Sequence, residues 1–182
     1  YATNNEIQRN SNDRVCHTSS GTPFGCCASA DGCIGAINEG QADVHSYIMF
    51  NSPTIGEFFM NSMSGLPGRH AEQNSGVTAQ QRFNDGSFGR EIHYMGGIWG
   101  AAWWTLRKRI GSTDSDKIFF AHLPLLAGND NFRTALSTII SAQDALKSSG
   151  KIAKDYKSDI LSAFSQHGIS PSTSTFVSLG QD

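Results

Sequence analysis

The sequence predicts a mainly α-helical protein, and three observations support this class. Apolar residues recur at the helical period in several segments, most clearly from Phe132 to Leu146. Residues typical of helix starts and helix ends flank these segments. The chain also contains 38% hydrophobic and 10% aromatic residues over a length of 182, enough to build a core and too much for wholesale disorder.

The N-terminal segment, residues 1–34, has almost no hydrophobic periodicity and is expected to be an irregular loop. All four cysteines of the chain fall in it, at Cys16, Cys26, Cys27 and Cys33. An even number of cysteines in a loop rich in Gly and Ser favours two disulfides and an oxidising compartment, extracellular or periplasmic. A small zinc site formed by these sulfurs and His17 is the alternative. The spacing leaves the disulfide connectivity open.

Two helices and a loop are expected next. Four apolar residues at helical spacing predict a helix over residues 34–50: Ile37, Val44, Tyr47 and Ile48. Thr54 and Glu57 match a capping box, which predicts a short helix over residues 54–63. Residues 64–91 are rich in Gly, Pro, Asn and Ser and are expected to form a loop.

The C-terminal half is expected to hold four more helices. The first, over residues 97–110, is apolar and then basic before Gly111. The second helix is expected over residues 116–126, capped by Thr113 or Asp114. The third is expected to run through Leu146, capped by Asn129 or Asp130. The last is expected over residues 155–166, and Gly168 follows its C-terminal end. Residues 170–182 read as a polar tail. The chain thus divides into a loop over 1–34, a helical domain over 35–169 and a tail over 170–182.

Composition and charge exclude some classes of function. A net charge of -2 and a pI near 6.3 give no electrostatic reason to expect a nucleic-acid partner. No apolar run approaches the roughly 20 residues that cross a bilayer. The chain begins at Tyr1 rather than at Met and has no signal peptide, so we expect a processed product or an excised fragment.

Glu39 and Asp43 are the first candidates for a functional site. They lie four residues apart in the predicted helix over 34–50 and therefore share one face. In a metal site, one such carboxylate binds the ion and the other orients a histidine ligand. The sequence contains no His-Glu-x-x-His motif, so further ligands must come from elsewhere.

His93 is the second candidate. It comes just before a predicted helix, and Gly96 and Gly97 follow it, so its ring can point into a cleft that the backbone also approaches. An imidazole in that position can donate a hydrogen bond to an oxyanion. A loop histidine with a structural hydrogen bond is the alternative.

The remaining histidines and the tryptophans have simpler expected roles. His45 lies nearly opposite Glu39 on its helix and is expected to be a surface or packing residue. His70 is expected to be exposed in a loop, with a place lining a cleft as the alternative. His122 and His167 come late in helices, where a cation interacts well with the helix dipole. We expect Trp99, Trp103 and Trp104 to pack in the core or at a domain interface rather than to stack on a ligand.

Several of these motifs resemble the thermolysin-like zinc metallopeptidases. Asn38-Glu39 with Asp43 is similar to the family's Asn-Glu-x-x-x-Asp helix, and His93 with Gly97-Ile98 is similar to its His-x-x-x-Gly-Ile motif. The stretch from Trp99 to Arg107 looks more like the related fungalysin branch. The resemblance runs through the helical part, from Gly35 to Ile169.

The resemblance implies a thermolysin-like C-terminal helical domain and a specific set of roles. Glu39 would be the third zinc ligand, and Asp43 would hydrogen-bond a zinc-binding histidine. Asn38 would precede Glu39 as in the family. His93 would stabilise the tetrahedral intermediate. The family's substrate-binding arginine is replaced by asparagine in the matching stretch, residues 61–64, and Arg69 would serve in its place, with Arg82 as the alternative. The resemblance is also compatible with a bound calcium ion.

The resemblance further implies that the chain is the C-terminal half of a secreted zinc endopeptidase and is inactive alone. A segment or chain with His-Glu-x-x-His, from the same precursor or from another subunit, would supply two zinc ligands and the general base. A non-catalytic binding or inhibitory protein on a degenerate peptidase scaffold is the alternative.

Overall fold

The computed structural model describes residues 32–56, 69–85, 92–128 and 130–171 of the chain. These residues are mainly helical and include six α-helices, which confirms the mainly-α class. The expected cysteine-rich loop up to residue 31 and the tail from residue 172 lie outside the described residues.

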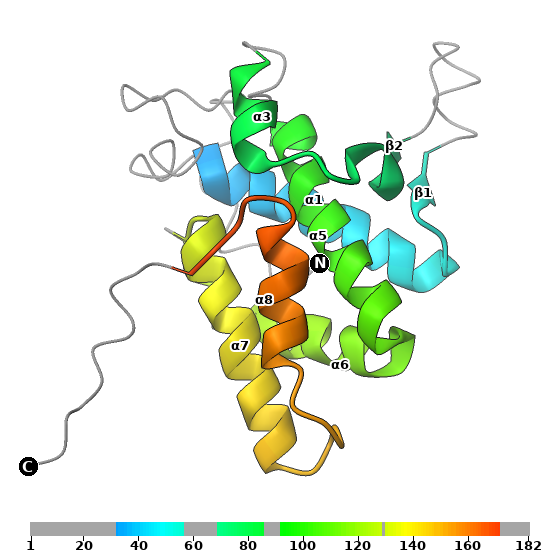
Figure 1. Ribbon diagram of the computed structural model, residues 1–182, viewed down its shortest axis with the longest axis vertical. Coiled ribbons are helices and arrows are strands. Elements are labelled where there is room, and N and C mark those ends of the chain that lie inside the picture. The colour runs from blue at the N-terminus through cyan, green and yellow to red at the C-terminus, as the bar shows by residue number, and fades with distance from the viewer. Residues whose placement is uncertain (1–31, 57–68, 86–91, 129, 172–182) are drawn as a thin grey trace, which may run out of the picture.

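Helix α5 (Ile92–Ile110) is the centre of the described part (Figure 1). Four helices pack along it, and a fifth packs mainly on two of those four and contacts α5 through its own first residue. The four are α1 (Gly32–Phe50), α3 (Ala79–Asn84), α6 (Ser112–His122) and α8 (Lys157–Ser165), and the fifth is α7 (Phe132–Ser148), which packs on α6 and α8. No helix in the described ranges is both long enough and apolar enough to cross a membrane.

The core forms around two tryptophans of α5. Trp99 stacks on Phe132 of α7 with ring centroids 5.6 Å apart. Trp103 meets Phe119 of α6 edge to face at 5.2 Å and Phe164 of α8 at 5.7 Å. Aromatic pairs in these geometries add to the free energy of burial. The core positions expected for Trp99 and Trp103 are confirmed, whereas Trp104 is half-buried and donates its indole N–H to Glu72.

The long helices agree with the sequence prediction, and their ends differ. α1 begins at Gly32, inside the expected loop, and α5 begins by Ile92, so His93 lies within a helix rather than before one. α6 begins at Ser112, right after Gly111 (φ 87), and ends at His122, before the 3-10 helix η3 (Leu123–Leu125) with Pro124. Proline ends the α-helical hydrogen-bond ladder there.

The start of α7 is a further difference. Asn131, not Asn129 or Asp130, caps α7: its side chain accepts from Arg133 N and Thr134 N, and the Thr134 hydroxyl accepts from Asn131 N. Asp130 instead accepts a hydrogen bond from Ala127 N. α8 is followed by Gly168 at φ 71, the left-handed conformation that glycine adopts at helix ends.

The prediction of a helix from Thr54 is wrong at its start. Thr54–Ile55 forms strand β1, which pairs antiparallel with β2 (Arg69–His70), and residues 57–63 of that prediction lie outside the described residues. Two β-branched residues after Pro53 suit a strand once a partner is available. The Ala71 amide also donates to the Pro53 carbonyl at 2.8 Å, which fixes the pair.

The prediction of a loop over residues 64–91 is also wrong in part. That range includes β2, the 3-10 helix η2 (Ala71–Asn74) and helix α3. Thr78 and Gln81 form a capping box at the start of α3, a signal that the sequence contains.

The expectation of cationic histidines at the ends of helices is not met for His122 and His167. Both side chains are buried, and burial lowers the pKa of His122 from 6.5 to about 4. Burial also lowers the pKa of His167, whose Nδ1 lies 3.0 Å from the Val77 carbonyl and whose Nε2 lies 3.2 Å from the Thr105 hydroxyl. Each ring is therefore a neutral packing group near pH 7.

Candidate functional site

Glycines on α1 and α5 allow the main chains of the two helices to come into direct contact. A Cβ atom added to Gly96 would lie 2.7 Å from the Ala36 carbonyl oxygen and 2.8 Å from the Gly40 amide nitrogen. A Cβ atom added to Gly40 would lie 2.5 Å from the Gly96 carbonyl oxygen. Only glycine allows main chains to come this close. The crossing therefore brings together the side chains that flank these glycines on both helices.

The crossing places Glu39 of α1 beside His93 of α5. His93 lies three residues before Gly96 and so shares its face of the helix. The His93 Nε2 atom lies 3.2 Å from the Glu39 Oε2 atom, and the two form an ion pair when the ring is protonated. The side chains are 41% and 28% exposed, respectively, so solvent and ligands can reach both.

Asp43 lies one helical turn after Glu39 and is paired with Arg69 of β2. The Arg69 Nη2 atom donates to the Asp43 Oδ1 atom at 2.6 Å. The Asp43 side chain is 2% exposed and the Arg69 side chain 41% exposed. The β1–β2 pairing holds Arg69 near the C-terminal part of α1, because β1 follows α1 directly. Four residues that the sequence singled out therefore lie near one another: Glu39, Asp43, Arg69 and His93.

The second oxygen of Asp43 is unsatisfied. Its Oδ2 atom is buried and has no hydrogen-bond partner among the described residues. Burial raises the pKa of Asp43 from 3.8 to about 6; the Arg69 guanidinium opposes this shift and the Glu39 carboxylate adds to it. A buried polar atom without a partner costs about 1–3 kcal/mol, more when charged. This oxygen is thus prepared to accept a hydrogen bond from a donor that the described residues do not supply.

The other residues expected in the site lie around it or outside the described part. Asn38 is half-buried on α1, next to Glu39. Cys16, Cys26 and Cys27 lie outside the described residues, as does the side chain of Cys33. No disulfide prediction is therefore tested.

Arg82, the alternative substrate-binding arginine, has a structural role. Its Nη2 atom donates to the Asn74 Oδ1 atom at 2.5 Å, and Asn74 donates in turn to the Gly97 carbonyl of α5 at 3.4 Å. The arginine that lies beside a site carboxylate is Arg69.

His45 and His70 lie away from the contact between Glu39 and His93. His45 is exposed on α1 and meets the Phe120 ring edge to face at 5.9 Å, as expected of a surface or packing residue. His70 is half-buried rather than exposed, and its Nδ1 accepts from the Glu72 amide.

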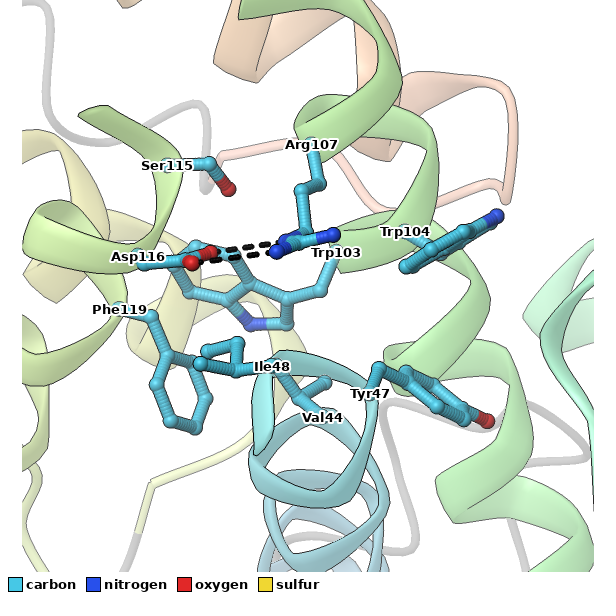
Figure 2. A pocket seen from close by; sticks show the side chains of 9 residues that line it. All are labelled: Val44, Tyr47, Ile48, Trp103, Trp104, Arg107, Ser115, Asp116 and Phe119. Carbon is cyan, nitrogen blue, oxygen red and sulfur yellow. Dashed lines mark hydrogen bonds and ion pairs between the residues drawn. The ribbon is translucent and has the colours of Figure 1, made fainter. Parts of the chain in front are cut away.

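A small pocket lies at a different place, between α1, α5 and α6 (Figure 2). Its charged groups are paired: Arg107 donates to both carboxylate oxygens of Asp116, at 2.9 and 3.2 Å, and to Asn51 at 2.8 Å. The buried indole nitrogen of Trp103, which also lines the pocket, has no hydrogen-bond partner among the described residues. Aromatic and aliphatic side chains form most of the remaining wall: Val44, Tyr47, Ile48, Trp103, Trp104 and Phe119. The Arg107–Asp116 ion pair and the apolar side chains around it join α1, α5 and α6 at this pocket.

The described residues do not form a complete metal site. Within the described ranges, no three histidine, cysteine or carboxylate side chains come together in a way that could hold an ion. This finding does not test the expected zinc site, since two of its ligands would come from another segment. Comparison with family models, curated proteins and solved structures found no match to this chain.

The sequence shows Gly96 soon after His93, but the joint contact of Gly96, Gly100 and Gly40 that brings α1 and α5 together was not predicted from it. Gly96 and Gly100 lie four apart on α5, and added Cβ atoms on them would contact Glu39 and Asp43 Cβ at 3.2 and 3.7 Å. The Gly96-x-x-x-Gly100 spacing was the available signal, because it puts two small residues on one helix face. On α1, Gly40 makes the matching close contact with the main chain of Gly96.

Proposed function

We propose that this chain is the C-terminal half of a secreted zinc endopeptidase of the thermolysin type, acting with a segment or chain that carries His-Glu-x-x-His. The observation that supports this most is the unpartnered, buried Oδ2 atom of Asp43, one turn from the Glu39–His93 contact. Zinc-binding histidines usually donate their second ring N–H to a carboxylate or a carbonyl. A histidine from the missing segment would give Asp43 its partner.

The donor chemistry of the site fits zinc. Glu39 offers an accessible carboxylate, and carboxylate oxygens bind zinc at about 2.0–2.2 Å. Glu39 with two histidines from the missing segment would give the three protein ligands that catalytic zinc sites use, with one position left open. When bound, zinc supplies a Lewis acid for the peptide carbonyl and lowers the pKa of water.

The chain's own residues would bind the substrate and stabilise charge. Because Nε2 faces Glu39, His93 would donate its Nδ1–H to the negative charge that develops on the peptide oxygen. Arg69 has five N–H donors, of which Asp43 accepts one, and its 41% exposed side chain can also reach a peptide carbonyl. We expect the substrate to be a peptide or protein bound in extended form.

Reassembly tests this proposal. The chain that co-purifies with this one from its natural source is identified, and the two are mixed with zinc and a denatured protein substrate. We expect proteolysis that a strong chelator abolishes and added zinc restores. Activity that survives the chelator would show that the mechanism is not zinc-dependent.

A non-catalytic binding protein is the second candidate, and one observation favours it. The site carboxylates already have partners within the chain, Glu39 with His93 and Asp43 with Arg69. In that case the complex would form without zinc, and the mixture would hydrolyse no substrate at any zinc concentration.

A further inference from the structure

We propose that His93 also has a positioning role: it fixes the Glu39 carboxylate so that one oxygen faces the metal. This inference rests on the function proposed above and adds to it a determinant of zinc affinity. The observation behind it is the 3.2 Å distance between His93 Nε2 and Glu39 Oε2.

The contact divides the two oxygens of Glu39 between two tasks. Nε2 can donate to Oε2 when the ring is protonated or when the neutral ring carries its proton on Nε2. With Oε2 held in this way, Oε1 remains for a metal ion. A partly exposed glutamate otherwise samples several rotamers, and fixing one of them costs conformational entropy when the ion binds. Carboxylates that bind metals are typically held by a hydrogen bond of this kind.

The helix crossing fixes the main-chain positions of both residues. Glu39 lies next to Gly40, and Gly40 and Gly96 are in backbone contact, so the two side chains start from helices whose separation is set by direct packing rather than by a loop. The second carboxylate of α1 has its own partner, since Asp43 is held by Arg69. A different side chain therefore orients each carboxylate: Arg69 orients Asp43, and His93 orients Glu39.

This role predicts an effect that charge stabilisation alone would not produce. A group that only stabilises a transition state leaves the affinity of the resting site for zinc unchanged. A group that orients a ligand changes that affinity, typically by about 10- to 100-fold.

The test measures zinc affinity in the complex with the co-purifying chain, by competition with a chromophoric chelator at one fixed pH. We expect His93→Leu to weaken zinc binding about 10- to 100-fold. His93→Gln keeps an N–H donor at a similar reach and should bind zinc within about threefold of wild type, although proteolysis falls in both variants. His45→Gln, on the outer face of α1, is the matched control and should change neither quantity.

The outcomes separate this inference from the proposed function. Unchanged or tighter zinc binding in His93→Leu, with weaker binding in Glu39→Gln, would overturn the positioning role alone. Equal losses in His93→Leu and His93→Gln would also overturn it, because the donor would then not matter. A Glu39→Gln complex with unchanged zinc affinity would overturn the proposed function, and the positioning role with it.

Discussion

Gly96→Ala is expected to destabilise the fold, because this glycine is where α1 and α5 meet. The new methyl group would lie 2.7 Å from one backbone atom and 2.8 Å from another, both on α1. Main-chain atoms cannot rotate away as a side-chain tip can, so the helices must separate. Overpacking of this kind typically costs about 1–3 kcal/mol, and here the upper part of that range applies.

Helix propensity works in the opposite direction. Replacing glycine by alanine inside a helix gains about 0.8–1 kcal/mol. The net loss expected for Gly96→Ala is therefore about 2 kcal/mol in the free energy of unfolding. For a chain of this size that corresponds to a fall of about 4–8 °C in Tm.

The neighbouring residue provides the control. A Cβ atom on Gly97 would meet the Asn74 side-chain amide at 3.0 Å, and this amide can shift more easily than main chain although it is hydrogen-bonded to Arg82 and to the Gly97 carbonyl. We expect Gly97→Ala to lie within about 0.5 kcal/mol of wild type, since the propensity gain offsets the shift of Asn74. Urea unfolding of both variants decides the matter. A Gly96→Ala protein as stable as Gly97→Ala would refute the close crossing.

Two further predictions concern buried polar groups. His122 has a pKa lowered by burial to about 4, so its contribution to stability is present above about pH 6.5 and is lost as pH falls toward 4. Relative to His122→Phe, the wild-type protein should lose about 3 kcal/mol over that window, and parallel stability curves would contradict this. Arg107 and Asp116, 10% and 23% exposed, should show a coupling energy of about 1–3 kcal/mol in a double-mutant cycle of Arg107→Leu and Asp116→Asn. Additive losses in urea unfolding would show that the pair contributes nothing beyond packing.

The sequence predicted the fold best where a helix carries its own signals. α7 has apolar residues at helical period and an asparagine cap, and its prediction missed only which residue is the cap. The prediction failed at Thr54–Ile55, because a two-residue strand depends on pairing with Arg69–His70, distant in sequence. It also failed for His122, whose neutral state follows from burial against α5 and not from its place near a helix end.

The candidate site also has features that the sequence predicts and features that depend on tertiary packing. The four-residue spacing of Glu39 and Asp43 and the glycines after His93 were visible in the sequence. The distance between Glu39 and His93 was not, because it depends on how closely α1 and α5 pack. The missing partner of Asp43 Oδ2 was also not visible, since it depends on the burial of that atom among distant residues.

The central claim is that Glu39 is a zinc ligand in a site completed by another polypeptide. The most direct measurement compares the zinc dissociation constants of the wild-type complex, Glu39→Gln and the control Glu72→Gln, whose carboxylate lies on the surface with Lys108. The account predicts markedly weaker zinc binding for Glu39→Gln and wild-type binding for Glu72→Gln. Equal zinc affinity in all three proteins would contradict it.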